Sequence, residues 1–183
     1  MTKLKESPSQ TAGPYVHIGC VPNVAGLSGR QLGDQLGSQM VRDHALETIS
    51  LRIAVLDGAN EPVRDALLEI WQPGTNGTYS STAQFHNWGR QAVDPSTGIA
   101  EFQTLKPGAP TGQAPHVLVW IVARGINLGL TTRIYFPDED NSKDNVLRLA
   151  GSRAGTLIST KSDEGYIHTI RLQGEGETVF FDV

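Results

Sequence analysis

One segment, Leu105–Phe136, constrains the fold of this chain more than any other. It reads LKPGAPTGQAPHVLVWIVARGINLGLTTRIYF: a loop with three prolines, an apolar run, an Arg-Gly pair and a second apolar run. The two runs, Val117–Val122 and Thr131–Phe136, are short and lie between segments rich in Gly, Pro and Asn. Short apolar runs bounded by turn residues are typical of buried strands, so the segment predicts two strands.

The same pattern recurs along most of the chain. Further strand positions are Thr48–Leu56, Val63–Trp71, Tyr79, Phe102, Tyr166–Leu172 and Thr178–Phe181. The 20 glycines and 10 prolines among 183 residues supply the turns between them. A chain of this length with this pattern predicts one all-β domain, an antiparallel β-sandwich with long loops. Asp144–Ala150 is the best candidate for a short helix, and Ala154–Ser159 adds a possible second turn of helix.

The N-terminal quarter lacks this pattern. Residues 1–47 predict an extended arm and an irregular insert that forms an interface, and residues 48–183 form the sandwich. Gly13-Pro14 cannot continue a helix, and Tyr15–Ile18 behind it is a short strand-like run. Four glycines between positions 21 and 48 break any helical period, so we expect at most one turn of helix there. An insert of this length usually lies over a surface or reaches a neighbouring chain.

Charge and composition exclude several classes of function. The net charge of −4 argues against nucleic acid or an anionic membrane surface as a partner. No apolar run approaches the ~20 residues that span a bilayer, and no apolar core of a secretory signal follows the N-terminal lysines. A cytoplasmic location is therefore the default expectation. Cys20 is the single cysteine, which excludes an intrachain disulfide, and no Gly-x-Ser-x-Gly turn of a serine hydrolase is present.

A longer motif indicates the family. Asp57–Gln72 matches D-x-x-x-x-P-V-x-D-A-x-x-E-x-W-Q, which resembles the signature of intradiol ring-cleavage dioxygenases. The resemblance covers roughly residues 7–183, and its further matches are Gly77-Thr78-Tyr79, Trp88-Gly89-Arg90, Phe102–Gly108, Ala114-Pro115-His116 and Thr132–Phe136. It implies a β-sandwich that uses non-haem Fe(III) and O2 to open catechol rings between the two hydroxyls.

Most residues that such a family uses to hold iron are missing. The resemblance implies a site of two tyrosinates and two histidines, with the histidines as an H-x-H pair on one face of a strand. Here that pair reads His116-Val117-Leu118, and leucine binds no metal. No tyrosine follows the Lys-Pro-Gly loop before His116, none lies in Ser80–Asn87, and Gln113 replaces an arginine near the substrate. With one ligand of four left, we predict no metal ligand and no catalytic residue in this chain.

The remaining motif residues have structural interpretations. His116 is expected to be a hydrogen-bonded structural histidine, and no spacing pairs His17 or His86 with it. Tyr79 and Tyr135 are expected in the core or at its rim. Because buried aromatic side chains dominate β-sandwich cores, the three tryptophans are expected to pack there: Trp71, Trp88 and Trp120.

Within the family, the chain resembles a non-catalytic α subunit that pairs with a homologous, iron-bearing β subunit. The runs that carry this resemblance are Ser9–Tyr15, Ala123–Asn127 and Gly174–Asp182. It implies a hetero-oligomer of αβ units in which the partner binds the Fe(III) and this chain contributes a wall of the substrate cavity. The residues implied to line that wall are Thr11, Gly13, Pro14 and Tyr15. Arg124 would bind the carboxylate of a small aromatic substrate through charge-assisted hydrogen bonds.

Three other interpretations stay open. A self-sufficient dioxygenase with rearranged ligands would bind iron as a single chain. A transthyretin-like binding module without enzymatic role also has a strand after D-x-x-x-x-P-V, but it would not explain Ser9–Tyr15 or Gly174–Asp182. For Arg124, the alternative is a solvated arginine at a strand end, where ion pairing contributes only ~0–1 kcal/mol.

Overall fold

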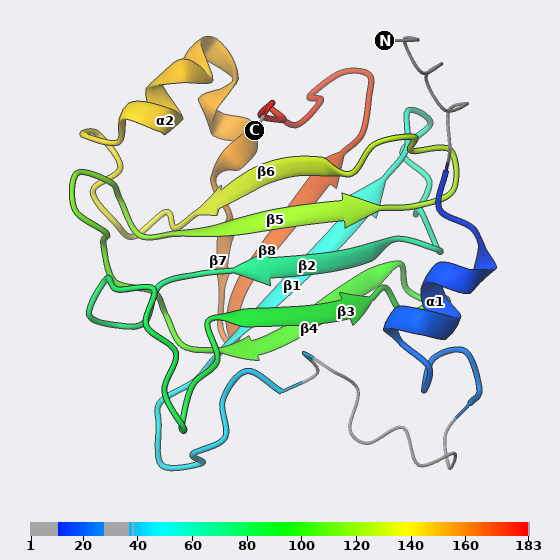
Figure 1. Cartoon of the computed structure of the whole chain (residues 1–183). Helices are drawn as coiled ribbons and strands as arrows, with labels where there is room; N and C mark the ends of the chain where they lie inside the picture. The colour runs from blue at the N-terminus through cyan, green and yellow to red at the C-terminus, as the bar shows by residue number, and fades with distance from the viewer. Residues whose placement is uncertain (1–10, 28–36, 38, 183) are drawn as a thin grey trace, which may run out of the picture.

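Two four-stranded sheets pack face to face in the computed structural model, which describes residues 11–27, 37 and 39–182 (Figure 1). The first sheet has the order β4 (Ile99–Thr104), β1 (Ile49–Leu56), β8 (Gly165–Arg171) and β7 (Thr160–Ser162). The second has the order β3 (Trp88–Ala92), β2 (Leu67–Trp71), β5 (His116–Val122) and β6 (Leu130–Tyr135). The predicted all-β sandwich is confirmed. Strand pairs are antiparallel except β1 with β8, which run parallel.

The core lies between the two sheets and follows the alternation of the strands. In β5 the inward side chains are Val117, Val119 and Ile121, each at most 1% exposed. Phe102 on β4 meets them from the facing sheet. Because successive side chains of a strand point to opposite faces, His116 and Trp120 stand on the outer face of the second sheet.

The prediction of a strand-like run at Tyr15–Ile18 is wrong. The segment lies in helix α1 (Pro14–Cys20), which begins directly at the proline. Proline is unfavourable inside a helix because it lacks the N–H that would bond to the preceding turn. In the first turn of a helix that N–H would have no intrahelical partner, so proline is well tolerated there. Gly13-Pro14 therefore marks the start of a helix, whereas the sequence analysis predicted that it excludes a helix at this position.

The two helical predictions near the C-terminus are confirmed with shifted ends. Helix α2 (Asn145–Leu149) begins after Asp144, whose carboxylate accepts hydrogen bonds from Val146 N and Leu147 N. The 3-10 helix η1 (Gly151–Leu157) follows directly. Thr178–Phe181, by contrast, forms no strand; Phe181 makes a single bridge to Thr131 at the edge of β6.

After α1, the described part of the N-terminal quarter is irregular, as predicted; that it forms an interface stays a prediction. Residues 21–27 and 39–48 contain turns and one bridge, Val41 with Phe85, and no helix or strand. Strands β3 and β7 were not predicted, because neither carries an apolar run. Residues 1–10, 28–36 and 38, which belong to the predicted arm and insert, lie outside the described residues.

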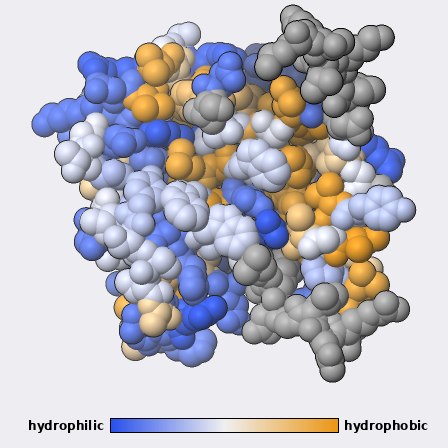
Figure 2. All heavy atoms as spheres, viewed as in Figure 1, coloured by the Kyte–Doolittle hydropathy of each residue, from blue (hydrophilic) through white to orange (hydrophobic). Residues whose placement is uncertain are grey.

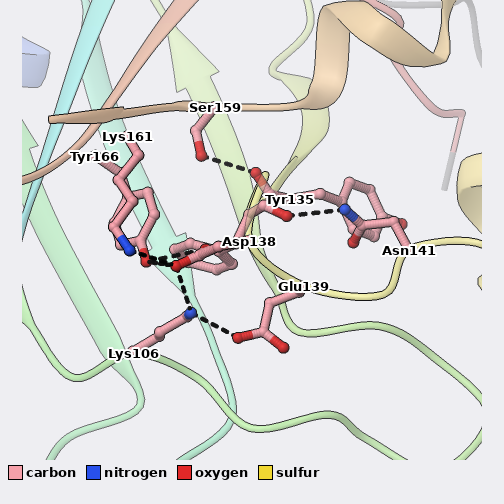
Figure 3. A network of polar contacts seen from close by, with 9 residues as sticks. Lys106, Tyr135, Asp138, Glu139, Asn141, Ser159, Lys161 and Tyr166 are labelled. Atoms are coloured by element: carbon pink, nitrogen blue, oxygen red, sulfur yellow. Dashed lines mark hydrogen bonds and ion pairs between the residues drawn. The ribbon is translucent and has the colours of Figure 1, made fainter.

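A polar network ties the two sheets together at one end of the sandwich (Figure 3). Lys106, which follows β4, lies 3.2 Å from Asp138 and 2.6 Å from Glu139, which follow β6. Asp138 also accepts hydrogen bonds from Lys161 at 2.9 Å and from Tyr166 at 2.9 Å, both in the first sheet. Burial alone would lower the pKa of Lys106, but hydrogen bonds with Glu139, Tyr166 and Asp138 outweigh it and raise that pKa. The network is structural, since every charge in it has a partner.

Among the described residues, no helix combines the length and the apolar character that crossing a lipid bilayer requires.

Candidate functional site: a cavity beside the N-terminal helix

A cavity of about 440 Å³ lies between α1 and the turn that follows β5. Gly13, His17 and Ile18 line it from the N-terminal segment, and Arg64, Asp65 and Arg124 line it from the sandwich. Hydrophobic residues gather on the side of the molecule where α1 lies (Figure 2). The cavity therefore has an apolar floor with two arginines at its border, and we call it the Arg124 cavity.

The turn that carries Arg124 is held by hydrogen bonds from two sides. On one side, Gly125 N donates to Thr11 Oγ1 at 2.7 Å, and Thr11 Oγ1 donates to Ala123 O at 3.5 Å. On the other side, Arg124 N donates to Asp65 Oδ2 at 3.1 Å. Gly125 has φ +90°, a conformation that favours glycine. Thr11 therefore fastens the N-terminal segment to a turn whose own shape is fixed by Gly125 and Asp65.

The structure brings three of the five predicted site residues together. Gly13 and Arg124 line the cavity, and Thr11 is bonded to the turn that carries Arg124. Pro14 begins α1, and the Tyr15 side chain is 83% exposed and is not among the residues that line the cavity. The guanidinium of Arg124 forms no ion pair with any described residue, so its charge is available to a ligand.

Three further lining residues escaped the sequence interpretation. His17 was taken as part of a strand-like run, but on α1 its side chain reaches the cavity. Arg64 and Asp65 belong to the P-V-x-D-A motif, where Asp65 could have been singled out as a polar residue directly before a buried strand. The contact of Asp65 with Arg124, 59 residues further along the chain, depends on the pairing of β2 with β5.

The polar residues at the other end of β5 form a closed group around His116. This histidine is fully buried; its Nδ1–H donates to Ala114 O at 2.8 Å and its Nε2 accepts from the Tyr79 hydroxyl at 3.2 Å. Burial lowers the pKa of His116, so the ring is neutral and this tautomer is fixed. His116 is therefore hydrogen-bonded, as predicted, and its structural role stays a prediction. Tyr79 is a half-exposed rim residue, but sequence reasoning missed that it meets His116.

An arginine reaches this group from the neighbouring strand. Arg133 on β6 donates to Gln113 Oε1 at 2.7 Å and lies 3.4 Å from the Tyr135 hydroxyl. Tyr135 in turn donates to Asp144 Oδ1 at 3.1 Å, and burial raises its pKa to about 12. Arg133 thus lies beside Gln113, the position at which the family resemblance implies an arginine.

The residues around His116 do not fit a ferric ion. Leu118 occupies the second histidine position, and it pairs with Trp71 on β2 and with Arg133 on β6. Both nitrogens of His116 already have partners, and the charge of Arg133 acts on His116 and Tyr79. A fixed cation beside the two remaining donors opposes a metal cation. Among the described residues, no three His, Cys, Asp or Glu side chains are grouped to hold a metal.

The tryptophans are not core residues, contrary to prediction. Trp71 is 44% exposed and Trp120 38% exposed, and Trp88 is partly buried. All three side chains stand on the outer face of the second sheet, because they alternate with the inward residues of β2, β3 and β5. Aliphatic residues and Met40 fill the core instead, together with Phe85, Phe102, Phe136 and Tyr166.

Comparison with known proteins defines the class. An intradiol ring-cleavage dioxygenase from Tetranychus urticae superimposes with a TM-score of 0.60 at 18% identity, covering 73% of this chain and 83% of that one. The dioxygenase domain of a carbohydrate-binding fusion from Streptomyces sp. SirexAA-E gives 0.55 at 23% identity over 73% and 84%. The fold is that of the intradiol dioxygenases. No protein-family model matches the chain.

Two curated relatives identify the branch. The protocatechuate 3,4-dioxygenase alpha chain of Pseudomonas putida is 41% identical, over 98% of this chain and 97% of its own. The alpha chain of Burkholderia cepacia is 34% identical over the full length of both. The beta chain from Burkholderia cepacia is 31% identical over 51% of this chain and 46% of its own. The chain belongs to the family of protocatechuate 3,4-dioxygenase alpha chains.

Proposed function

We propose that this chain is the non-catalytic subunit of a cytoplasmic protocatechuate 3,4-dioxygenase. The assembled enzyme would cleave 3,4-dihydroxybenzoate with O2 to 3-carboxy-cis,cis-muconate, and the homologous β subunit would bind the Fe(III). An alpha chain with a homologous beta chain implies a heteromeric assembly, which supports this division of labour. The set of donors around His116, which does not suit iron, supports it as well.

The contribution of this chain would be one wall of the active-site cavity. The observation that carries the proposal is the guanidinium of Arg124, which has no ion-pair partner among the described residues and stands on a turn held by Thr11 and Asp65. A fixed arginine at the border of an apolar cavity would attract a carboxylated catechol and orient it by charge-assisted hydrogen bonds. Gly13 beside it leaves room for close approach of the ring. We further propose that Pro14, Tyr15 and the insert 21–48 contact the β subunit or the substrate in the assembly.

The test is Arg124→Ala in the assembled enzyme, with Arg148→Ala on the exposed face of α2 as the matched control. We expect the apparent KM for 3,4-dihydroxybenzoate to rise about tenfold or more, as for loss of one charge-assisted bond. Catechol, which lacks the carboxylate, should be turned over equally by both variants. An unchanged KM for the carboxylated substrate would contradict the proposed role and show that Arg124 is a solvated surface arginine.

The division between the two chains has its own test. The single chain, purified without its partner, should carry no stoichiometric iron and no visible tyrosinate-to-iron absorption band. A coloured and active preparation of this polypeptide alone would instead support a self-sufficient dioxygenase. A transthyretin-like module has lost its support, because similarity to alpha chains extends over the whole length of this chain.

A further inference from the structure

The turn that follows β2 contains the only Asn-Gly pair of the sequence, Asn76-Gly77. Such a pair is chemically labile, because glycine has no side chain to keep its backbone nitrogen away from the side chain of the preceding asparagine. We call Gly74–Gly77 the Asn76 turn. The Arg124 cavity is lined by other residues, so the inference does not rest on the proposed function.

The reaction of such a pair needs water and base alone. Gly77 N loses its proton and attacks Asn76 Cγ, so that an N–C bond forms and the side-chain nitrogen leaves as ammonia. Water then opens the cyclic imide at one of its two carbonyls, which gives either aspartate or isoaspartate. Asn76 is exposed, so water and base both reach its amide. Whether the asparagine reacts therefore depends on how the fold places the two reacting atoms.

The attacking nitrogen is bonded inside the turn. Gly77 N donates to Gly74 O at 2.9 Å, which closes a β-turn of four residues. The same carbonyl accepts a second hydrogen bond, from Gly108 N at 3.0 Å, and Gly74 N donates to Thr78 O at 2.8 Å. Before Gly77 N can attack, its N–H must leave Gly74 O. The fold thus opposes the first step of the reaction.

The amide that would be attacked is held by Thr78. Asn76 Oδ1 accepts hydrogen bonds from Thr78 N at 3.1 Å and from the Thr78 hydroxyl at 2.8 Å. Asparagine commonly bonds in this way to the backbone two residues further on. The two bonds restrain the side-chain rotation that would bring Cγ over Gly77 N. They also polarise the amide carbonyl, but polarisation assists the attack only when the nitrogen has reached Cγ.

Close packing against a second loop keeps the Asn76 turn in this shape. Gly77 has φ +77°, and a Cβ at this position would collide with Ala109 O. A Cβ on Gly108 would likewise collide with Thr75 O. The backbones of the two loops therefore touch, and the turn cannot change its geometry unless it separates from the loop.

We propose that Asn76 is a deamidation site of this protein, that the folded turn holds it in check, and that the Thr78 hydroxyl restrains its amide. The reaction then proceeds through local opening of the turn, since the closed turn keeps Gly77 N bonded. Isoaspartate would add a methylene to a backbone that leaves no room beside Ala109. The modified chain would lose this loop contact and, with it, part of its resistance to denaturant.

The experiment incubates the full-length protein at mildly alkaline pH, native and in guanidinium chloride, and follows deamidation by peptide mapping with mass spectrometry. Asn141, which precedes a serine, is the internal reference. We expect Asn76 to react at least about tenfold more slowly in the native protein than in the denatured chain. Thr78→Val, which keeps the side-chain volume and removes the hydroxyl, should raise the native rate at Asn76 about fivefold. Thr78→Ser, the matched control, should keep the wild-type rate.

Four outcomes would overturn the proposal. Equal rates at Asn76 in the native and denatured protein would show that the turn gives no protection. Equal rates in Thr78→Val and Thr78→Ser would show that the hydroxyl does not restrain the amide. A slower reaction in Thr78→Val would show that the hydroxyl promotes the attack by polarising the carbonyl. A rise at Asn141 by the same factor as at Asn76 would show that the substitution loosens the whole chain.

Discussion

The two ends of strand β5 carry polar groups in opposite states. At its first residue, His116 has both ring nitrogens bonded within the chain, and Arg133 beside it is paired with Gln113. Past its last residue, roughly 20 Å away at the rise of a strand, the Arg124 guanidinium has no ion-pair partner among the described residues, although its backbone is held firmly. A satisfied polar group stabilises a fold, whereas a positioned and unsatisfied one can bind. The difference separates the position of the missing metal site, where the polar groups are paired within the chain, from the turn that we propose binds the substrate.

The largest expected effect concerns a buried histidine whose Nε2, unlike that of His116, has no hydrogen-bond partner among the described residues. His168 on β8 is 3% exposed, its Nε2 has no partner among the described residues, and burial lowers its pKa to about 4. The unfolded chain takes up this proton near pH 6.5 and the folded chain only near pH 4. Stability should therefore fall by about 3 kcal/mol as the pH drops from 6.5 to 4, with no further contribution below pH 4.

Chemical denaturation between pH 7 and 4 measures this slope for the wild type and for His168→Leu. In His168→Leu, the free energy of unfolding should no longer show the decrease with pH that His168 causes. A smaller decrease should remain, because burial also lowers the pKa of His116. A variant with the wild-type slope would show that other groups cause the acid lability.

Removing the paired histidine is expected to cost about 2 kcal/mol. His116→Leu roughly keeps the volume of the side chain but leaves the buried Ala114 carbonyl without its donor and the Tyr79 hydroxyl without its acceptor. The measurement is the free energy of unfolding by urea at pH 7. Because His116 is proposed to be structural, kcat of the assembled enzyme should stay near wild type; a loss of activity at unchanged stability would contradict the assignment.

Loosening the Arg124 turn is expected to have a smaller effect, and one on substrate binding. Thr11→Val keeps the volume of the side chain but removes the acceptor for Gly125 N and the donor to Ala123 O. We expect about 1 kcal/mol, seen as a roughly fivefold higher KM for 3,4-dihydroxybenzoate at similar kcat. Thr11→Ser, which retains the hydroxyl, is the control and should behave like the wild type.

The smallest effect is predicted for Tyr79→Phe, at roughly 0.5 kcal/mol of unfolding free energy. The change removes the hydrogen bond to His116 Nε2, but Tyr79 is 39% exposed, so water can reach the vacated acceptor. Urea denaturation of Tyr79→Phe, His116→Leu and the wild type measures this difference in the free energy of unfolding. If Tyr79→Phe costs as much as His116→Leu, the hydroxyl is better shielded than its exposure indicates.

The hydrophobic pattern of the sequence predicted the strands in which apolar and polar residues alternate or in which several apolar residues follow one another. It failed for strands that have neither pattern. Trp88–Ala92 pairs with β2 through its backbone while its side chains are mostly half-buried, so no hydrophobic period reveals it. The helix at Pro14 was missed because proline is common both in the first turn of a helix and in extended segments, so the residue alone does not distinguish the two. The tryptophans were misplaced because composition ranks their hydrophobicity without telling which face of the sheet they occupy.

The sequence by itself determined the fold class, the family and the loss of the second histidine at Leu118, because these follow from residue types at fixed spacing along one strand. It also named Thr11, Gly13 and Arg124. Only the tertiary structure decided that Thr11 is bonded to the turn of Arg124, more than a hundred positions away, and that Asp65 holds the same turn. Such contacts depend on which strands pair and on where the N-terminal segment packs, and the spacing of residues along the sequence determines neither.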